Sequence, residues 1–280
     1  MTETPDNPAL RRLILHVGVQ KTATTSLQRH LQRNQAALAR RLVIRTPQEG
    51  TPMRPLGRAA IAFSLDPGAG SKQALQRAFA DVLEGLPANG LPVLLSHENL
   101  AGAMPGNGGE TRLFPALPRI AAILARQARG FACQVVFYSR DMDQWRASVW
   151  AQAVRSDGYA GSYQQFLAQT AELPDWDDLA RRLTDRLGAG RVTHLRLRDE
   201  PDPQRPGSLL LAHAGLDSTE IAALTPLDSP GMERLNAGST EFLRRLNGLV
   251  LNPDARGLVA DLVARNQSLF NADFRPAGTL

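Results

Sequence analysis

Short apolar runs alternate with longer amphipathic stretches along most of this 280-residue chain. Runs of about four to eight apolar residues are typical of strands buried inside a sheet, whereas apolar positions spaced three and four apart are typical of helices. The apolar runs predict five strands, at 12–17, 42–45, 92–96, 133–139 and 191–197. The amphipathic stretches predict helices at 24–39, 72–86, 112–129, 143–155, 176–187, 208–214, 240–251 and 255–270.

Alternating strands and helices indicate an α/β fold with a central, mainly parallel sheet of about five strands. After residue 198 the pattern is helical only, which predicts a helical C-terminal part. Connections rich in glycine and proline lie at 46–57, 101–109, 200–207 and 225–238, and none has the character of a linker between domains. We therefore expect one domain over residues 1–280, with residues 1–11 as a flexible N-terminal tail.

Basic residues outnumber acidic ones, 32 to 27, and give the chain a formal charge of +5. Only Lys21 and Lys72 are lysines, and all the other Lys and Arg positions are arginine. A charge of this size spread over the whole length is weak evidence for a nucleic-acid partner, which needs basic residues gathered on one face. We expect no nucleic-acid partner, whereas a pocket for a small polyanion needs only a few of these arginines.

The compartment is indicated by the single cysteine and by the N-terminus. Cys133 lies in an apolar run, so no intramolecular disulfide can form, and we expect a buried, inert thiol in a reducing cytoplasm. The first ten residues carry two acids and two prolines and do not resemble a secretory signal. No window approaches the roughly 18 uninterrupted apolar residues that a membrane-spanning helix needs, so we expect no transmembrane segment.

The most informative motif is the stretch 13–28, which reads LILHVGVQKTATTSLQ. An apolar strand leads into Gly18 and Lys21, a run of small hydroxyl residues follows, and a helical pattern begins near Leu27. The backbone amides of residues 21–26 and the start of the helix can surround an anion, and Lys21 supplies a point charge. The hydroxyls of Thr22, Thr24, Thr25 and Ser26 are further expected donors. A Ser/Thr-rich helix N-cap without a ligand is the alternative.

The NTPase phosphate loop has glycine directly before its lysine, but here Gln20 stands in that place. The pattern GxxKTATTS instead resembles the 5′-phosphosulfate loop of sulfotransferases that use 3′-phosphoadenosine 5′-phosphosulfate (PAPS), and small soluble bacterial sulfotransferases in particular. Ala23 replaces the glycine that is usual there. The resemblance implies a three-layer, P-loop-type α/β domain in which Gly18, Lys21 and residues Thr22, Ala23, Thr24, Thr25 and Ser26 bind the 5′-phosphosulfate.

A second motif follows the strand predicted at 133–139, where the sequence reads SRDMDQWRASVW. Arg140 comes at the carboxyl end of that strand, where open parallel sheets bind ligands. A helix then begins, with Asp141 or Asp143 as its cap, and Ser148 lies two turns into it. The arrangement is similar to the sulfotransferase element for the 3′-phosphate of PAPS, which implies that Arg140 and Ser148 bind that phosphate. A surface arginine at a helix start is the alternative.

The sequence SHEN follows the strand predicted at 92–96, again at a carboxyl end. Sulfuryl transfer to a hydroxyl needs a base for the acceptor's proton, and either His97 or Glu98 could accept it, Glu98 if burial raised its pKa. In the cytosolic sulfotransferases a histidine in a similar position is the base, whereas small bacterial relatives more often carry Ser-Ser-Glu. Both residues therefore stay open as the catalytic base, and His97 could also be a solvated loop residue.

The remaining candidates are weaker. Arg234 precedes a helix for which Ser239 or Thr240 is the expected cap, and the resemblance makes this arginine a further candidate for the 3′-phosphate. His16 lies inside the first strand and is expected to be a packed or hydrogen-bonded core residue. No pair of histidines has the spacing of metal ligands, so we expect no metal site.

The resemblance implies a PAPS-dependent sulfotransferase with Lys21 and His97 or Glu98 in catalysis, PAPS as co-substrate, 3′,5′-adenosine bisphosphate (PAP) as product, and no metal. The acceptor could be a small molecule, a lipid or a carbohydrate, and the stretches 46–70 and 101–109 are expected to shape its pocket. A P-loop kinase or NTPase acting on ATP is the first alternative, with Glu98 or Asp141 as the partner of Mg²⁺. A catalytically degenerate nucleotide-binding module is the second. The pattern leaves the oligomeric state open.

Overall fold

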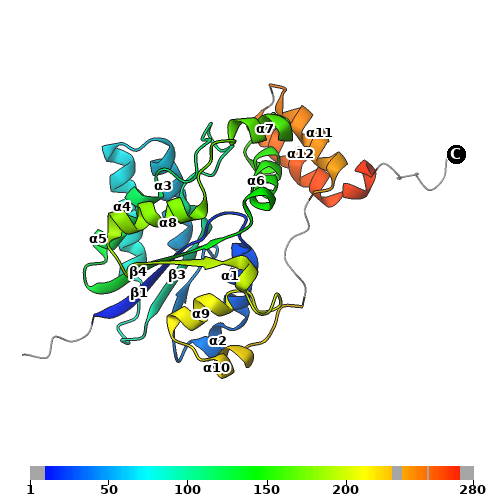
Figure 1. The fold of residues 1–280 in the computed structure, drawn as a ribbon. Coiled ribbons are helices and arrows are strands. Elements are labelled where there is room, and N and C mark those ends of the chain that lie inside the picture. The colour runs from blue at the N-terminus through cyan, green and yellow to red at the C-terminus, as the bar shows by residue number, and fades with distance from the viewer. Residues whose placement is uncertain (1–9, 229–234, 251, 272–280) are drawn as a thin grey trace, which may run out of the picture. The chain divides into compact units, whose positions relative to one another are not determined.

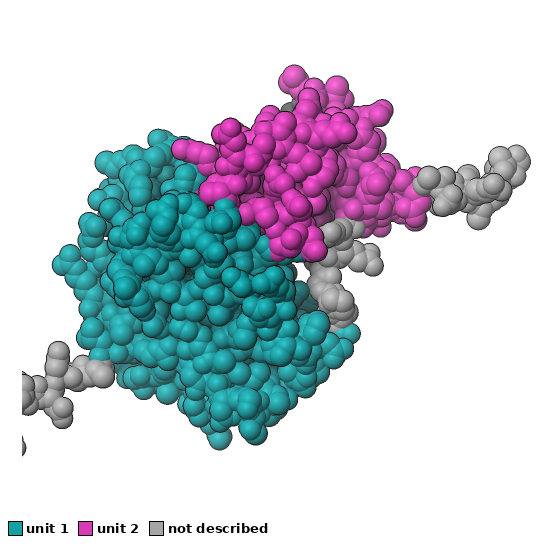
Figure 2. Space-filling view, in the orientation of Figure 1, with its two compact units in different colours: residues 1–102, 114–140, 175–230 teal, residues 103–113, 141–174, 231–280 magenta. Residues whose placement is uncertain are grey.

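The computed structural model describes residues 10–228, 235–250 and 252–271. The chain forms two compact units, each assembled from three separate segments. Figure 2 shows unit 1 in teal and unit 2 in magenta. Unit 1 comprises residues 1–102, 114–140 and 175–230, and unit 2 comprises residues 103–113, 141–174 and 231–280.

Unit 1 is built on a sheet of five strands in the order β2-β3-β1-β4-β5, and every neighbouring pair is parallel. The central strand β1 is fully buried from Leu13 onward, because helices cover both faces of the sheet. The strands are β1 Arg11–Val17, β2 Val43–Arg45, β3 Val93–His97, β4 Phe131–Ser139 and β5 Val192–Arg196. The expected parallel α/β sheet is thereby confirmed.

Two layers of helices enclose this sheet (Figure 1). On one face, Ile14, Leu94 and Val136 form a core with leucines of α1, α2 and α9. The opposite face is covered by α3, α4, α5 and α8, which completes the expected three layers. The helices of unit 1 are α1 Thr24–Arg33, α2 Gln35–Leu38, α3 Met53–Leu65, α4 Ala69–Glu84, α5 Leu117–Gln127, α8 Trp176–Leu187, α9 Ser208–Ala214 and α10 Ser218–Ala222, with 3₁₀ turns at Glu98–Ala101 and Leu197–Asp199.

Unit 2 is helical in its described residues and contains two of the three helices expected after residue 198, whereas the third, α9, belongs to unit 1. The elements of unit 2 are α6 Met142–Ser156, α7 Tyr163–Gln169, α11 Ala237–Asn247, α12 Pro253–Arg265 and a 3₁₀ turn at Gln267–Phe270. Val154, Leu243, Ala260 and Val263 form its small core. Over the residues described in both units, no helix is long and apolar enough to cross a membrane.

The stretch 46–57 was predicted as a connection, and this prediction is wrong for its second half. Helix α3 begins at Met53. Pro55 lies in the first turn of α3. A helix tolerates proline there because backbone N–H groups of the first turn have no intrahelical acceptor, so no bond is lost. Gly57 is buried inside the helix, so it serves close packing and not a turn.

The single helix predicted at 24–39 is divided into α1 and α2 by Asn34. The buried Asn34 side chain donates to Thr225 O (2.9 Å) and accepts from Thr225 N (2.8 Å), on a distant segment. Because these bonds join residues far apart in sequence, helical periodicity could not reveal the break. The cap expected at Ser239 or Thr240 is also wrong, because Asn236 caps α11 by accepting from Ser239 N (2.7 Å).

Candidate active site

The loop between β1 and α1 closes tightly against the end of β3. Gly18 N donates to His97 O at 3.2 Å. A Cβ at Gly18 would lie 2.7 Å from Thr24 Cγ2 and 3.2 Å from Glu98 Cα. Since real side chains do not approach so closely, only glycine lets the loop turn here. The first residue of the expected phosphate-binding motif is thus required by the packing of the loop itself.

The backbone of this loop alternates in hand. Lys21 and Ala23 adopt left-handed φ values of 68° and 63°, whereas Thr22 and Thr24 do not. Successive residues of alternating hand turn their amide groups toward one side and form an anion-binding concavity. The first intrahelical bond of α1 runs from Leu27 N to Ala23 O (3.0 Å), so the amides of the first turn lie ahead of the helical ladder.

The hydroxyls of Thr22 and Thr24 were expected to face a ligand, and the structure corrects this expectation. Thr22 Oγ1 donates to Val19 O at 2.6 Å and Thr24 Oγ1 donates to the same carbonyl at 3.4 Å. Both threonines are buried and stabilise the turn from inside. Thr25 is exposed and Ser26 is half-buried, so these two hydroxyls remain accessible to an anion.

Ala23 carries backbone strain that glycine would relieve. A left-handed conformation costs an L-residue about 1–2 kcal/mol, more than glycine loses in conformational entropy. We expect Ala23→Gly to raise the free energy of unfolding by about 0.5–1 kcal/mol, measured by urea denaturation. The matched control is Ala74→Gly on an exposed turn of α4, which should lower it by about 1 kcal/mol. A loss of stability in both variants would contradict the strained conformation at Ala23.

Buried polar side chains lie beneath the loop and join β1, α1 and β3. His16 Nδ1 and Ser96 Oγ are 2.8 Å apart. Gln28 Nε2 lies 3.5 Å from the same Ser96 Oγ and donates to Glu98 Oε2 at 3.0 Å. His16 and Ser96 have no solvent exposure. The network fixes the end of β3 against α1 and therefore orients Glu98. His16 is thus a hydrogen-bonded core residue, as expected.

His16 makes the stability of unit 1 depend on pH. Burial lowers its pKa to about 4, against a smaller opposing effect of the Glu98 charge. The unfolded chain binds this proton near pH 6.5 and the folded chain only near pH 4, so stability is lost as the pH falls through that window. From about pH 7.5 to pH 5.0 we expect a loss of about 2 kcal/mol through His16. Urea denaturation at both pH values should show a shallower dependence in His16→Asn, and an unchanged dependence would contradict this role.

The two candidate bases differ in access. His97 is buried, and Asn99 N donates to its Nδ1 at 3.2 Å. The other side of its ring packs against Gly57, where a Cβ would lie 2.0 Å from Nε2. The Glu98 side chain is 33% exposed, and its Oε2 lies 3.5 Å from His97 Nδ1. Glu98 is therefore the more accessible of the two candidate bases in unit 1.

The charge state of Glu98 follows from its partners. Burial alone would raise the pKa of Glu98, but its interaction with the neighbouring His97, together with the bond from Gln28, lowers it to about 2. This direction is opposite to the raised pKa that a carboxyl base would favour. Glu98 is ionised at neutral pH and can accept a proton, and an acceptor that displaces Gln28 or His97 from it would make it a stronger base.

The two residues expected at the 3′-phosphate belong to different units. Arg140 follows the carboxyl end of β4 in unit 1, and its carbonyl accepts from Trp176 Nε1 at 2.7 Å. Since β4 pairs with β1, Arg140 and the Lys21 loop follow neighbouring strands at the same sheet edge. Ser148 is buried on α6 in unit 2, and Asp141 caps that helix by accepting from Gln144 N. Arg234 lies outside the described residues.

Sequence reasoning missed the residues that hold the candidate base in place. Gln28 was part of the motif but was given no role, and Gly57 was assigned to a connection. Gln20, which replaces the glycine of the NTPase loop, donates to Gly102 O at 3.0 Å and holds the loop to the chain after β3. Gln28 lies one turn into α1, and a glutamine at such a position gives no local signal that its side chain reaches a neighbouring strand.

No protein-family model matches the chain, and a search of the curated proteins finds no similar protein. Within the described ranges, no group of three or more histidine, cysteine, aspartate or glutamate side chains is arranged to hold a metal ion.

Proposed function

We propose that the chain is a PAPS-dependent sulfotransferase, which transfers a sulfuryl group to a hydroxyl or amine of a small-molecule, lipid or carbohydrate acceptor. The observation that carries the proposal is the backbone of alternating hand at Lys21–Thr24, set between a buried parallel strand and a helix without a side-chain cap. Such a loop suits a phosphate or sulfate group. The position of Gln20, which closes the loop where the NTPase motif needs glycine, favours this class over the P-loop NTPases.

Each residue has a defined part in the proposed transfer. The amides of residues 22–26 would bind the 5′-phosphosulfate, and Arg140 would bind the 3′-phosphate. Glu98 or His97 would accept the proton of the acceptor while its oxygen or nitrogen bonds to sulfur. The bond from sulfur to the bridging oxygen breaks at the same centre, and Lys21 would stabilise the charge that PAP carries away. The proposed location is a reducing cytoplasm. The single cysteine, Cys133, agrees with this location because it is buried, and burial raises the pKa of its thiol to about 11.

Calorimetric titration with PAP and AMP tests the proposal, because the two differ in the 3′-phosphate. We expect PAP to bind the wild-type chain at least about tenfold more tightly than AMP, since a charge-assisted hydrogen bond contributes about 1.5–3 kcal/mol. Arg140→Ala should reduce PAP binding to the level of AMP and leave AMP unchanged. Arg77→Ala, at an exposed position on α4, is the matched control.

Other outcomes would select the alternatives. If AMP binds as tightly as PAP, the 3′-phosphate is not recognised and the proposal is wrong. Magnesium-dependent binding of ATP that is lost in Lys21→Ala would indicate a kinase or NTPase. Tight PAP binding without sulfation of any member of a broad acceptor panel would favour a degenerate binding module.

A further inference from the structure

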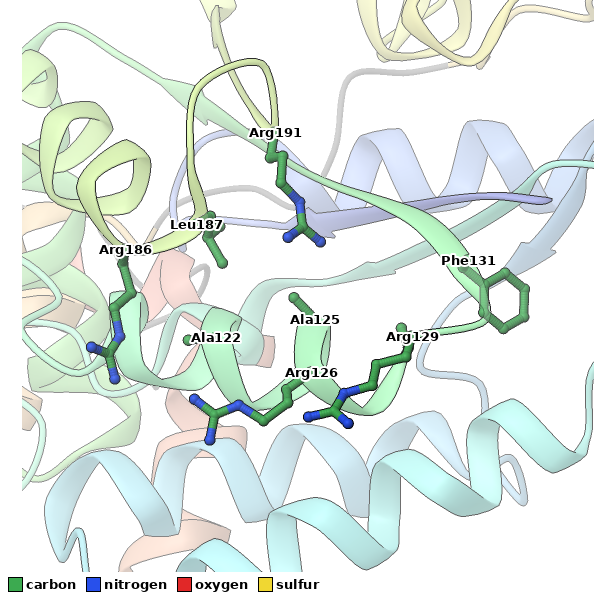
Figure 3. Close-up of a pocket in the computed structure, with 9 residues that line it drawn as sticks. Ala122, Ala125, Arg126, Arg129, Phe131, Arg186, Leu187 and Arg191 are labelled. Atoms are coloured by element: carbon green, nitrogen blue, oxygen red, sulfur yellow. The ribbon is translucent and has the colours of Figure 1, made fainter. Parts of the chain in front are cut away.

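A pocket of about 480 Å³ lies at the amino edge of the sheet, on the opposite edge from the Lys21 loop. Its walls are the last turns of α5, the start of β4, and the turn that joins α8 to β5. Four of its nine lining residues are arginines, namely Arg126, Arg129, Arg186 and Arg191, and none is acidic. Figure 3 shows Arg126 and Arg129 on the side of α5, and Arg186 and Arg191 on the side of the turn that joins α8 to β5.

The pocket arginines differ from neighbouring arginines in their ion pairs. On α8, Arg181 and Arg182 both pair with Asp178, at 2.5 and 2.7 Å. Among the residues that the structure describes, no ion pair involves any of the four pocket arginines. Arg191 Nε donates to Cys133 O at 3.2 Å, which directs its guanidinium.

Helix ends account for only part of this charge. Arg126 and Arg186 lie in the last turns of α5 and α8, where the helix dipole favours a cation. Two helix ends contribute about −0.5 charge each, so four guanidinium groups still leave a net charge of about +3 at the pocket. Arg129 and Arg191 lie outside the helices, so neither occupies a last helical turn where the dipole would stabilise its charge. Like charges gathered without counter-charges repel one another, and an anion would remove that repulsion.

We propose that this pocket binds a small polyanion with two or more phosphate or sulfate groups, at a site separate from the Lys21 loop. Guanidinium groups bind such oxyanions through paired hydrogen bonds. The volume suits a small molecule, because ligand pockets span about 300–1,000 Å³. The four arginines line one pocket, which favours a compact ligand over a nucleic-acid strand. Ala125 and Leu187 give the hollow an apolar lining that suits the carbon skeleton of such a ligand.

Calorimetric titration with inorganic tripolyphosphate tests this site, with Lys21→Ala as the background so that the loop at the other sheet edge contributes little. Adding Arg126→Ala and Arg186→Ala should raise the Kd about tenfold or more. The matched control adds Arg58→Ala and Arg77→Ala, two exposed arginines on α3 and α4, and should leave the Kd unchanged. All replaced arginines are exposed, and circular dichroism verifies folding. Arg129→Gln is the second variant, for use if the double variant unfolds.

Three results would overturn the site. Tripolyphosphate binding that is equally weak in both double-arginine variants would show general attraction by surface charge. Binding no tighter than that of chloride in the Lys21→Ala chain would show that the pocket holds no polyanion. A single-stranded oligonucleotide that binds more tightly than tripolyphosphate, with the same loss in Arg126→Ala/Arg186→Ala, would assign the arginines to nucleic acid.

Discussion

Replacing Lys21 with alanine is expected to raise the Kd of PAP about 10- to 100-fold, because a charge-assisted contact to phosphate contributes about 1.5–3 kcal/mol. Sulfation measured with labelled PAPS should fall further, by about 10²–10³, since the ammonium group would act most strongly on charge that develops on the leaving phosphate. Alanine has the same left-handed backbone cost as lysine at φ 68°, so the substitution leaves that strain unchanged.

The chain offers a natural control for this prediction. Lys72 is the other lysine, and it lies exposed on α4. Lys72→Ala makes the same change in net charge and should leave both PAP binding and sulfation unchanged. Equal losses in the two variants would mean that total charge, and not the loop, attracts the nucleotide. Lys21→Arg should recover only part of the effect, since a planar guanidinium does not replace a compact ammonium group.

The strands and the loop between β1 and α1 could be predicted because their signals are local. An apolar run, a glycine and a hydroxyl-rich helix start follow one another within 13–28, and the structure places β1, the loop and α1 in that order. Apolar runs also predict where β3 and β4 end, and they therefore predict His97, Glu98 and Arg140 at or next to strand ends. In the sheet, β3 and β4 lie on either side of β1, and all three strands are parallel, so their carboxyl ends lie at the same edge.

Interactions between distant segments explain what the sequence pattern missed. Asn34 breaks a helix because of bonds to Thr225, and Gly57 lies in a helix at a position where the His97 ring leaves no room for a side chain. The pKa of Glu98 is lowered by Gln28 and His97, whereas burial, the only effect that could be foreseen, would have raised it. The division of the chain into two compact units also depends on contacts between distant residues, because each unit consists of three separate segments of the chain.

Gly57→Ala is expected to lower the free energy of unfolding by about 2–3 kcal/mol, although alanine is the better helix former. A Cβ at this position would lie 2.0 Å from His97 Nε2 and 2.4 Å from Cε1, so either α3 or the imidazole must move. The His97 ring is buried and its Nδ1 accepts from Asn99 N at 3.2 Å, so a displaced ring would lose that bond. Urea denaturation measures the loss, and Gly70→Ala on α4 is the control. Nothing lies within 4 Å of the Cβ at Gly70, so that variant should be neutral or gain up to about 1 kcal/mol.

A double-mutant cycle separates this steric conflict from a general defect of α3. His97→Ala should destabilise the chain by opening a cavity, and the methyl group of Gly57→Ala should fill part of it. The double variant should therefore lose about 1–3 kcal/mol less than the sum of the two single losses. Strict additivity would show that Gly57 and His97 do not oppose each other. Because Glu98 Oε2 lies 3.5 Å from His97 Nδ1, a displaced ring in Gly57→Ala should also raise the pKa of Glu98 and weaken its orientation toward an acceptor. NMR titration of the Glu98 carboxyl measures that change, and it links the packing of α3 to the chemistry proposed at the end of β3.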